Sequence, residues 1–119
     1  MAEIQGKVWG NTQTITNMNG VCVNLIHCNA GGYCSWHKHN NKYNRFFVID
    51  GIMTIEVEKK DYDLVDKTVL SQEESTTVKP GEFHRFIANT DVIALEIYWT
   101  ELTEDIERRS CGGAQISEE

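Results

Sequence analysis

The sequence predicts an all-β fold in which short strands build one barrel or sandwich. Apolar and polar residues alternate in several short runs, turn residues separate these runs, and no long segment shows a helical repeat. A chain of 119 residues is large enough for one hydrophobic core and too small for two. We therefore expect one domain over residues 1–110, beginning with an edge strand, and a loose acidic tail at 111–119.

The clearest strand patterns lie in the middle and near the end of the chain. In IMTIEVE (52–58), the apolar residues alternate with polar ones, which is the repeat of a half-buried strand. In VIALEIYW (92–99), the larger apolar residues likewise share one side of the predicted strand, at Ile93, Leu95, Ile97 and Trp99. Further strands are expected over 21–28, 75–78 and 84–88.

The connections between these strands are also predicted. Asp50-Gly51 separates the apolar runs RFFVI and IMTIEVE, and this dipeptide favours a tight hairpin because both residues tolerate a positive φ. The charged stretch 58–74 is expected to be a strand end followed by a loop. The segment EIQGKVWG suits an edge strand that needs covering, and LTEDIERRS (102–110) is expected to form one helical turn.

Composition excludes several classes of function. The net charge is −7 and the basic residues are scattered, so neither nucleic acid nor an anionic membrane is an expected partner. No apolar stretch approaches the ~20 residues that cross a bilayer, and the chain does not open with a secretion signal. The four cysteines form no CxxC pair, which favours reduced thiols over a disulfide framework or a zinc knuckle. We expect a cytoplasmic protein.

Two histidines stand two residues apart in SWHKHN, at His37 and His39. On a strand such residues project from one face, so both could bind a single ion if that face points into a barrel. A pair of this kind is by itself more often part of a surface or a core than of a metal site. His84 makes a metal site the favoured interpretation, because it follows a Pro-Gly turn at the start of another predicted strand. Three imidazoles that converge in a cavity form a site for a divalent metal.

The two histidine segments resemble the two motifs of the cupin family. The first motif, G-x5-H-x-H-x3,4-E-x6-G, fits residues 31–51 in every spacing, with Asn44 in place of the glutamate. The second, G-x5-P-x-G-x2-H-x3-N, is matched more loosely by residues 74–89. The resemblance implies a single-domain cupin β-barrel, also called a jelly roll or double-stranded β-helix, and a homodimer, since cupins often pair. The implied metal ligands are His37, His39, Asn44 and His84.

A closer resemblance is to the cupin domain of bifunctional mannose-6-phosphate isomerase and mannose-1-phosphate guanylyltransferase enzymes. These domains share a Trp-Gly, a Glu-Ser-Thr, a His-Arg and an Asp-Ile-x-Arg with this chain, here at 9–10, 74–76, 84–85 and 105–108. The resemblance implies a sugar phosphate as ligand or substrate. Two departures stand out: His37 and Asn44 occupy the places of a glutamine and a glutamate, and the closing Tyr-Gly-Arg has no counterpart in Cys111-Gly112-Gly113.

Asn44 changes the expected chemistry of the centre. It offers a neutral carbonyl oxygen where a glutamate would partly neutralise the ion. The expected result is a three-histidine site with open positions, which keeps the full charge of the metal but binds it less tightly. The metal could be Zn, Fe, Mn or Ni. The alternative is a barrel that has lost its metal.

Three functions remain open on the sequence. A sugar-phosphate isomerase would need a metal at the two substrate oxygens and a base, for which Glu82 is possible, and a basic pocket, for which Arg85 and Arg108 are the phosphate-binding candidates. The runner-up is a mononuclear iron dioxygenase, which would need iron and an apolar or thiol-bearing pocket. The third is a non-catalytic barrel that binds a small ligand.

Overall fold

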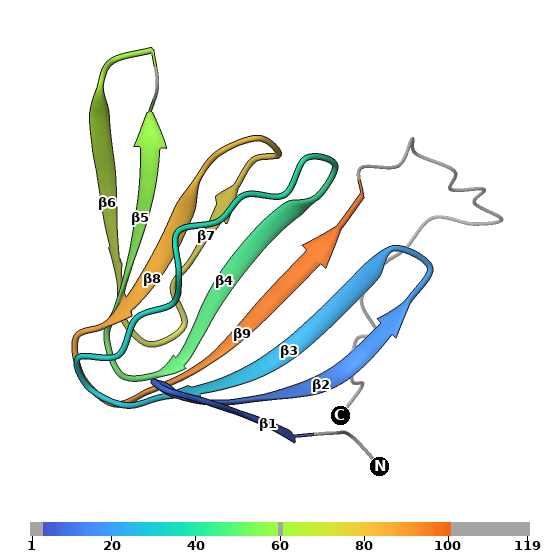
Figure 1. Cartoon of the computed structure of the whole chain (residues 1–119). Helices are drawn as coiled ribbons and strands as arrows, with labels where there is room; N and C mark the ends of the chain where they lie inside the picture. Colours follow the sequence, from blue (N-terminus) through green and yellow to red (C-terminus); the bar gives the residue numbers. More distant parts are fainter. Residues whose placement is uncertain (1–3, 60, 101–119) are drawn as a thin grey trace, which may run out of the picture.

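A computed structural model describes residues 4–59 and 61–100 of the chain, which form β-strands in two sheets (Figure 1). This confirms the predicted all-β class, and the described residues include no helix. The strands are β1 (Ile4–Lys7), β2 (Gly10–Met18), β3 (Val21–Cys28), β4 (Tyr43–Asp50), β5 (Met53–Lys59), β6 (Leu64–Leu70), β7 (Ser75–Val78), β8 (His84–Ala88) and β9 (Val92–Trp99).

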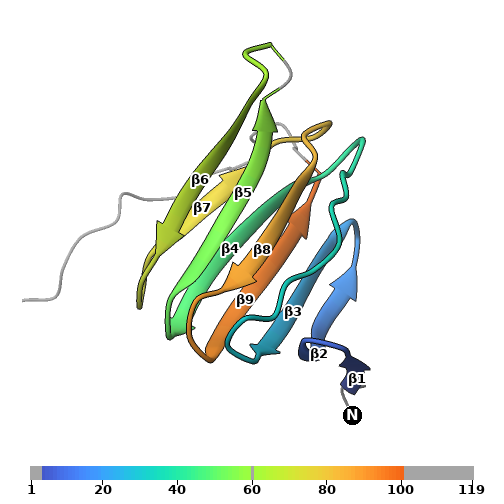
Figure 2. The ribbon, with the colours of Figure 1, turned by 60° about the vertical axis from the view of Figure 1, so that its left-hand side comes forward.

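The two sheets differ in size and face each other. The large sheet has the order β1-β2-β3-β9-β4-β7 and the small sheet the order β6-β5-β8, with antiparallel pairing throughout. Isolated bridges from Tyr33 to Ile87 and from His37 to His84 add the irregular segment 33–39 beside β8. In a second view the small sheet lies in front of the large one, with this segment running along its edge (Figure 2). The arrangement is the jelly roll that the sequence predicts.

The hydrophobic core lies between the sheets and gives way to polar side chains toward one end. Phe46 on β4 and Phe86 on β8 are buried, with ring centroids 6.0 Å apart. Two residues earlier in each strand, the inward positions are Asn44 and His84, both only 1% exposed. Because alternate residues of a strand share a face, the change from phenylalanine to polar side chains happens at the same level in both sheets. A polar interior therefore begins directly next to the apolar core.

The hairpin predicted at Asp50-Gly51 is wrong. β4 pairs with β7 and β9, whereas β5 pairs with β6 and β8, so this turn carries the chain from one sheet to the other. Gly51 has a φ of 94°, and a Cβ there would lie 2.2 Å from the Asp91 carbonyl oxygen. The glycine is needed for a close crossing between sheets, and its dipeptide pattern is the same as that of a hairpin.

Two strands do not follow the sequence-based expectation. The stretch 58–74, expected to be mainly loop, contains β6, which pairs along the whole of β5. All residues of β6 except Leu70 are exposed, so the strand lacks the apolar alternation that predicts one. In β9 the large apolar residues do share a side, but that side faces away from the core, while Val92, Ala94 and Glu96 are buried.

Other expectations are confirmed or untested. The strands expected over 21–28, 75–78, 84–88 and 92–99 coincide with β3, β7, β8 and β9, and β1 lies at an edge of the large sheet. The helical turn expected at 102–110 and the tail at 111–119 lie outside the described residues. The domain limits and the homodimer stay predictions. The described part of the chain contains no helix with the length and hydrophobicity that a membrane crossing requires.

Replacing Gly51 with alanine should destabilise the fold more than the same change at Gly31. Both glycines have a positive φ, but a Cβ at Gly31 meets nothing within 4 Å, whereas at Gly51 it meets backbone. Gly31→Ala should therefore cost only the backbone strain, about 1–2 kcal/mol. Gly51→Ala should add an overpacking cost of about 1–3 kcal/mol. Urea unfolding measures the free energy of unfolding of both variants. An equal loss of stability in the two would contradict a steric need for glycine at position 51.

Candidate metal centre

Three histidines meet in the polar part of the interior. His37 and His39 come from the segment 33–39 and His84 begins β8, and one ring nitrogen of each lies within 4.8 Å of the others. His37 and His84 form two backbone hydrogen bonds, of 3.1 and 2.8 Å. These bonds place the ring centroids of His37 and His84 4.4 Å apart. His39 falls on the same side two residues later, and Lys38 between them is exposed and lies over the Phe83 ring. The spacing in the sequence thus does bring the three imidazoles together.

Backbone carbonyls fix two of the rings in the tautomer that binds a metal. Nδ1 of His37 donates to the Ser35 carbonyl at 2.7 Å, and Nδ1 of His84 donates to the Glu82 carbonyl at 3.0 Å. A carbonyl oxygen can only accept, so each Nδ1 carries a proton, and in the neutral ring Nε2 then keeps its lone pair. Metal-binding histidines commonly have this arrangement, because the second hydrogen bond orients the ring.

Asn44 completes the group, and two buried atoms in it lack a partner. Nδ2 of Asn44 lies 3.1 Å from Nε2 of His84. Oδ1 of Asn44 and Nε2 of His39 are buried without a hydrogen bond. Leaving a buried polar atom unsatisfied costs about 1–3 kcal/mol, so two of them at one place call for a common partner. Both atoms can donate an electron pair, and the donor set of imidazoles and a carbonyl oxygen fits a divalent metal.

Burial favours the neutral form of His39 and His84. It lowers the pKa of His84 to about 4, while the hydrogen bond to the Glu82 carbonyl acts in the opposite direction. It also lowers the pKa of His39, and the neighbouring His37 and Lys42 act in the same direction. A neutral imidazole is the form that binds a metal, so these two rings need no deprotonation near pH 7.

Glu96 is a buried carboxylate near the centre that the sequence reasoning missed. It lies on β9, is 7% exposed, and accepts a hydrogen bond from Nδ2 of Asn24 at 3.4 Å. Burial raises the pKa of Glu96, while hydrogen bonds from Tyr98, Asn24 and Asn44 act in the other direction. The single glutamate in VIALEIYW is the only sequence signal for it, and that signal is visible only if the small residues of β9 are taken as the inward face.

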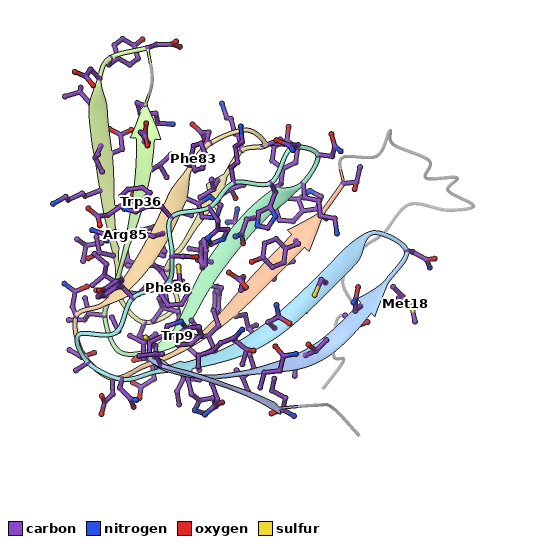
Figure 3. All side chains as sticks on the ribbon, in the orientation of Figure 1. Trp9, Met18, Trp36, Phe83, Arg85 and Phe86 are labelled. Atoms are coloured by element: carbon purple, nitrogen blue, oxygen red, sulfur yellow. The ribbon has the colours of Figure 1, made fainter. Side chains whose placement is uncertain are left out.

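A cavity of about 440 Å³ opens beside His37. Trp9 and Phe86 form one wall, where their rings pack edge to face at 5.0 Å (Figure 3). Burial raises the pKa of the Cys34 thiol to about 12, so this thiol is neutral. The cavity is thus aromatic and thiol-bearing on one side and polar on the other. Its remaining lining includes Lys7, Cys22, Cys34, Asn24, Glu96 and Tyr98.

Of the three residues predicted to be catalytic, the two that the structure describes, Glu82 and Arg85, make side-chain contacts away from the histidines. The Glu82 carboxylate binds Lys59 at 2.5 Å and the Lys79 backbone N–H at 3.0 Å, and only the Glu82 carbonyl contacts the centre. Arg85 donates to Glu56 at 2.8 Å and lies over the Trp36 ring (Figure 3). It follows His84 directly in β8, so it faces away from the histidines. Arg108 lies outside the described residues.

Known structures share this fold at low sequence identity. KdgF from Halomonas sp. matches with a TM-score of 0.66 and 14% identity, over 77% of this chain and 79% of that one. Oxalate decarboxylase from Bacillus subtilis, described with Mn(II) centres, matches with a TM-score of 0.75 and 10% identity, over 83% of this chain and 27% of that one. The capsular polysaccharide assembling protein CapF from Staphylococcus aureus matches with a TM-score of 0.71 and 18% identity, over 88% and 30%.

These identities establish the fold alone, and the chain spans less than a third of the oxalate decarboxylase and CapF chains. A comparison with curated proteins gives no significant match. The sequence does match the Cupin domain family over residues 24–101, which is well over half of the chain and includes both histidine segments. The chain therefore belongs to the cupin family.

Proposed function

We propose that this cupin binds one divalent metal ion through His37, His39 and His84 and uses it to hold a small oxygen-rich molecule in the adjacent cavity. The observation that carries the proposal is the convergence of three imidazoles on a place where Nε2 of His39 and Oδ1 of the adjacent Asn44 are buried without a partner. Zn, Fe, Mn and Ni all suit imidazole ligands. When bound, the ion supplies Lewis acidity and open positions for ligand oxygens.

The residues of the cavity suit a ligand with both an apolar and a polar part. Trp9 and Phe86 offer aromatic surface, while Asn24, Glu96 and Tyr98 offer hydrogen-bonding groups on the opposite sheet. A ligand of this kind would lie with its polar groups toward β3 and β9 and its apolar part toward Trp9.

The resemblance to mannose-6-phosphate isomerases supports a sugar phosphate as ligand. That reading needs basic residues to bind the phosphate. Among the described residues, Lys7 is the one lysine or arginine that lines the cavity, and Arg85 is held by Glu56 on the other face of β8. The observed lining thus gives the sugar-phosphate hypothesis limited support.

The cavity favours the oxygenase hypothesis more. This function needs an apolar or thiol-bearing pocket beside a neutral three-histidine centre. Two thiols and two aromatic rings line the cavity, from Cys22, Cys34, Trp9 and Phe86. Among the described residues, the cluster of possible metal ligands consists of three histidines and includes no carboxylate. A mononuclear ferrous centre for oxygen chemistry is therefore the second candidate function.

Removing any one histidine of the centre should sharply reduce metal content. His37→Ala, His39→Ala and His84→Ala each delete one of the three converging nitrogens. His27→Ala is the matched control, because His27 is an exposed residue of β3. Mass spectrometry of untagged protein, purified in parallel, measures the metal per chain. Equal loading in the triple-alanine variant would end the proposal.

The choice of metal should separate the two reactions. We expect the metal-free protein, reloaded with Fe²⁺, to bind nitric oxide at an open position and to show the corresponding electron paramagnetic resonance signal. We expect the Zn²⁺ and Mn²⁺ forms to leave mannose 6-phosphate unchanged, because the described cavity has a single lysine for phosphate. Conversion to the ketose by either form would instead support the isomerase.

Asn44→Glu should raise metal affinity. It restores an anionic oxygen beside His84, and an anion in a partly dehydrated cavity gains more from a cation than an amide does. The metal-free variant should melt at a lower temperature, because the new carboxylate then lies near Glu96. Asn44→Gln has the same length without the charge and is the control. Unchanged or lower affinity in Asn44→Glu, measured by competition with a chelating dye, would place Asn44 outside the centre.

A further inference from the structure

The large sheet has an apolar surface on the side that faces away from the small sheet (Figure 2). In the register, Leu95 of β9 is opposite both Leu25 of β3 and Phe47 of β4, and Ile97 of β9 is opposite Val23. These side chains point outward, because alternate residues of a strand share a face and the residues between them are buried or line the cavity. We call this surface the outer face. Its apolar members are Met18, Val21, Val23, Leu25, Tyr43, Phe47, Ile93, Leu95, Ile97 and Trp99.

The outward side of the small sheet has a different character. It presents Glu56, Lys67 and Arg85, which form ion pairs across its three strands. A polar side of this kind is usual where an antiparallel sheet faces water. On the outer face of the large sheet, large apolar side chains instead occupy neighbouring strands, and the described strands of the small sheet lie on the other side. A contiguous apolar surface marks a place where another surface binds.

Polar and mostly uncharged side chains border the outer face. The bordering residues of β2 include Gln13 and Thr16, and those of β7 are Ser75 and Thr77. Arg45 on β4 is turned toward this border, because its guanidinium donates to Thr77 and Ser75 at 2.7 Å each. An apolar centre with few charges and a polar rim is the composition of a protein–protein interface.

A second copy of the chain suits the outer face better than the segment that follows β9 does. Residues 101–119 contain three large apolar side chains, those of Leu102, Ile106 and Ile116, beside six acidic residues. The hydrophobic gain is proportional to the area covered, so three side chains recover little of what the outer face exposes. A second copy brings the whole apolar set, and two sheet faces of this kind pack about 10 Å apart.

The size of the outer face meets what a stable dimer needs. β9 lies in the middle of the neighbouring strands β2, β3, β9, β4 and β7. With strands ~4.8 Å apart and a length of ~27 Å for the eight residues of β9, this face covers roughly 600 Å². Two copies therefore bury about 1,200 Å² in total, above the ~1,000 Å² that a specific interface requires.

We propose that two copies of this chain form a dimer through the outer face, with a two-fold axis close to Leu95. A two-fold contact places the same surface on both sides, and Leu95 lies on the middle strand of that surface. The inward residues of the same strands, Asn24 and Glu96 among them, line the cavity beside the histidines. The second copy thus supports the wall of the cavity from behind and leaves its opening free. The inference does not depend on a bound metal.

Sedimentation equilibrium of the full chain tests this interface. The unaltered chain should have twice the mass of 13.6 kDa at micromolar concentration. Leu95→Asp brings two carboxylates together at the centre of the contact and should weaken the dimer at least about 30-fold, the size of a hot-spot loss. Val69→Asp is the matched control, because Val69 is an apolar residue on the outward side of the small sheet, and should leave the dimer unchanged.

A mixture of two variants tests the position of the axis. Leu95→Lys alone should be as monomeric as Leu95→Asp alone. Mixed in equal amounts, the two should form a dimer again, because opposite charges then meet across the axis. A mixture that stays monomeric would overturn the proposed axis, and a dimer that survives Leu95→Asp would place the contact elsewhere and overturn the inference.

Photocrosslinking decides the matter if the charged variants do not fold. With p-benzoylphenylalanine in place of Leu95, irradiation should give a covalent dimer, whereas the same residue in place of Val69 should give none. A monomeric unaltered chain would overturn the inference. A crosslink from position 95 to residues 101–119 of the same chain would also overturn it, because that segment would then be what covers the outer face.

Discussion

The backbone pairing of His37 with His84 is the interaction on which the site depends. Two hydrogen bonds hold an otherwise irregular segment beside the first residue of β8. This pairing sets the positions of two rings at once, and the extended chain brings the third to the same side two residues later. Further bonds from the segment to β8 and to Gly81 keep its path fixed. The site is thus built from main-chain geometry, and its side chains need few contacts with one another to converge.

The interior is divided along the strands, and this division explains why the polar groups can be buried. The apolar part, with Phe46 and Phe86 at its boundary, supplies the hydrophobic stabilisation of the fold. The polar part contains His84, Asn44 and Glu96, whose desolvation is offset by hydrogen bonds to carbonyls and amides. The cost that remains is concentrated at Asn44 and His39, where atoms are left without partners. Buried polar atoms without partners are typical of a binding site, because a bound ligand can supply the missing interactions.

The sequence predicted what depends on local pattern and missed what depends on the meeting of two sheets. The strands with clear turns, and the three histidines, follow from spacing along the chain. The turn at Gly51 could not be told from a hairpin, because positive φ serves both geometries. β6 was missed because an exposed strand needs no apolar alternation. Glu96 was missed because the larger residues of β9 face outward, so hydrophobic size pointed to the wrong face.

The buried thiol of Cys34 affects how the wall of the cavity reacts with oxidants. It accepts a hydrogen bond from the Phe86 backbone N–H at 3.3 Å and has a pKa of about 12. At pH 7 the neutral thiol predominates, and the thiolate is the form that reacts as a nucleophile. The sulfur atom therefore contributes bulk and polarisability to the wall, while the neutral thiol stays a poor nucleophile. Peroxides that enter the cavity therefore meet a sulfur that is slow to oxidise.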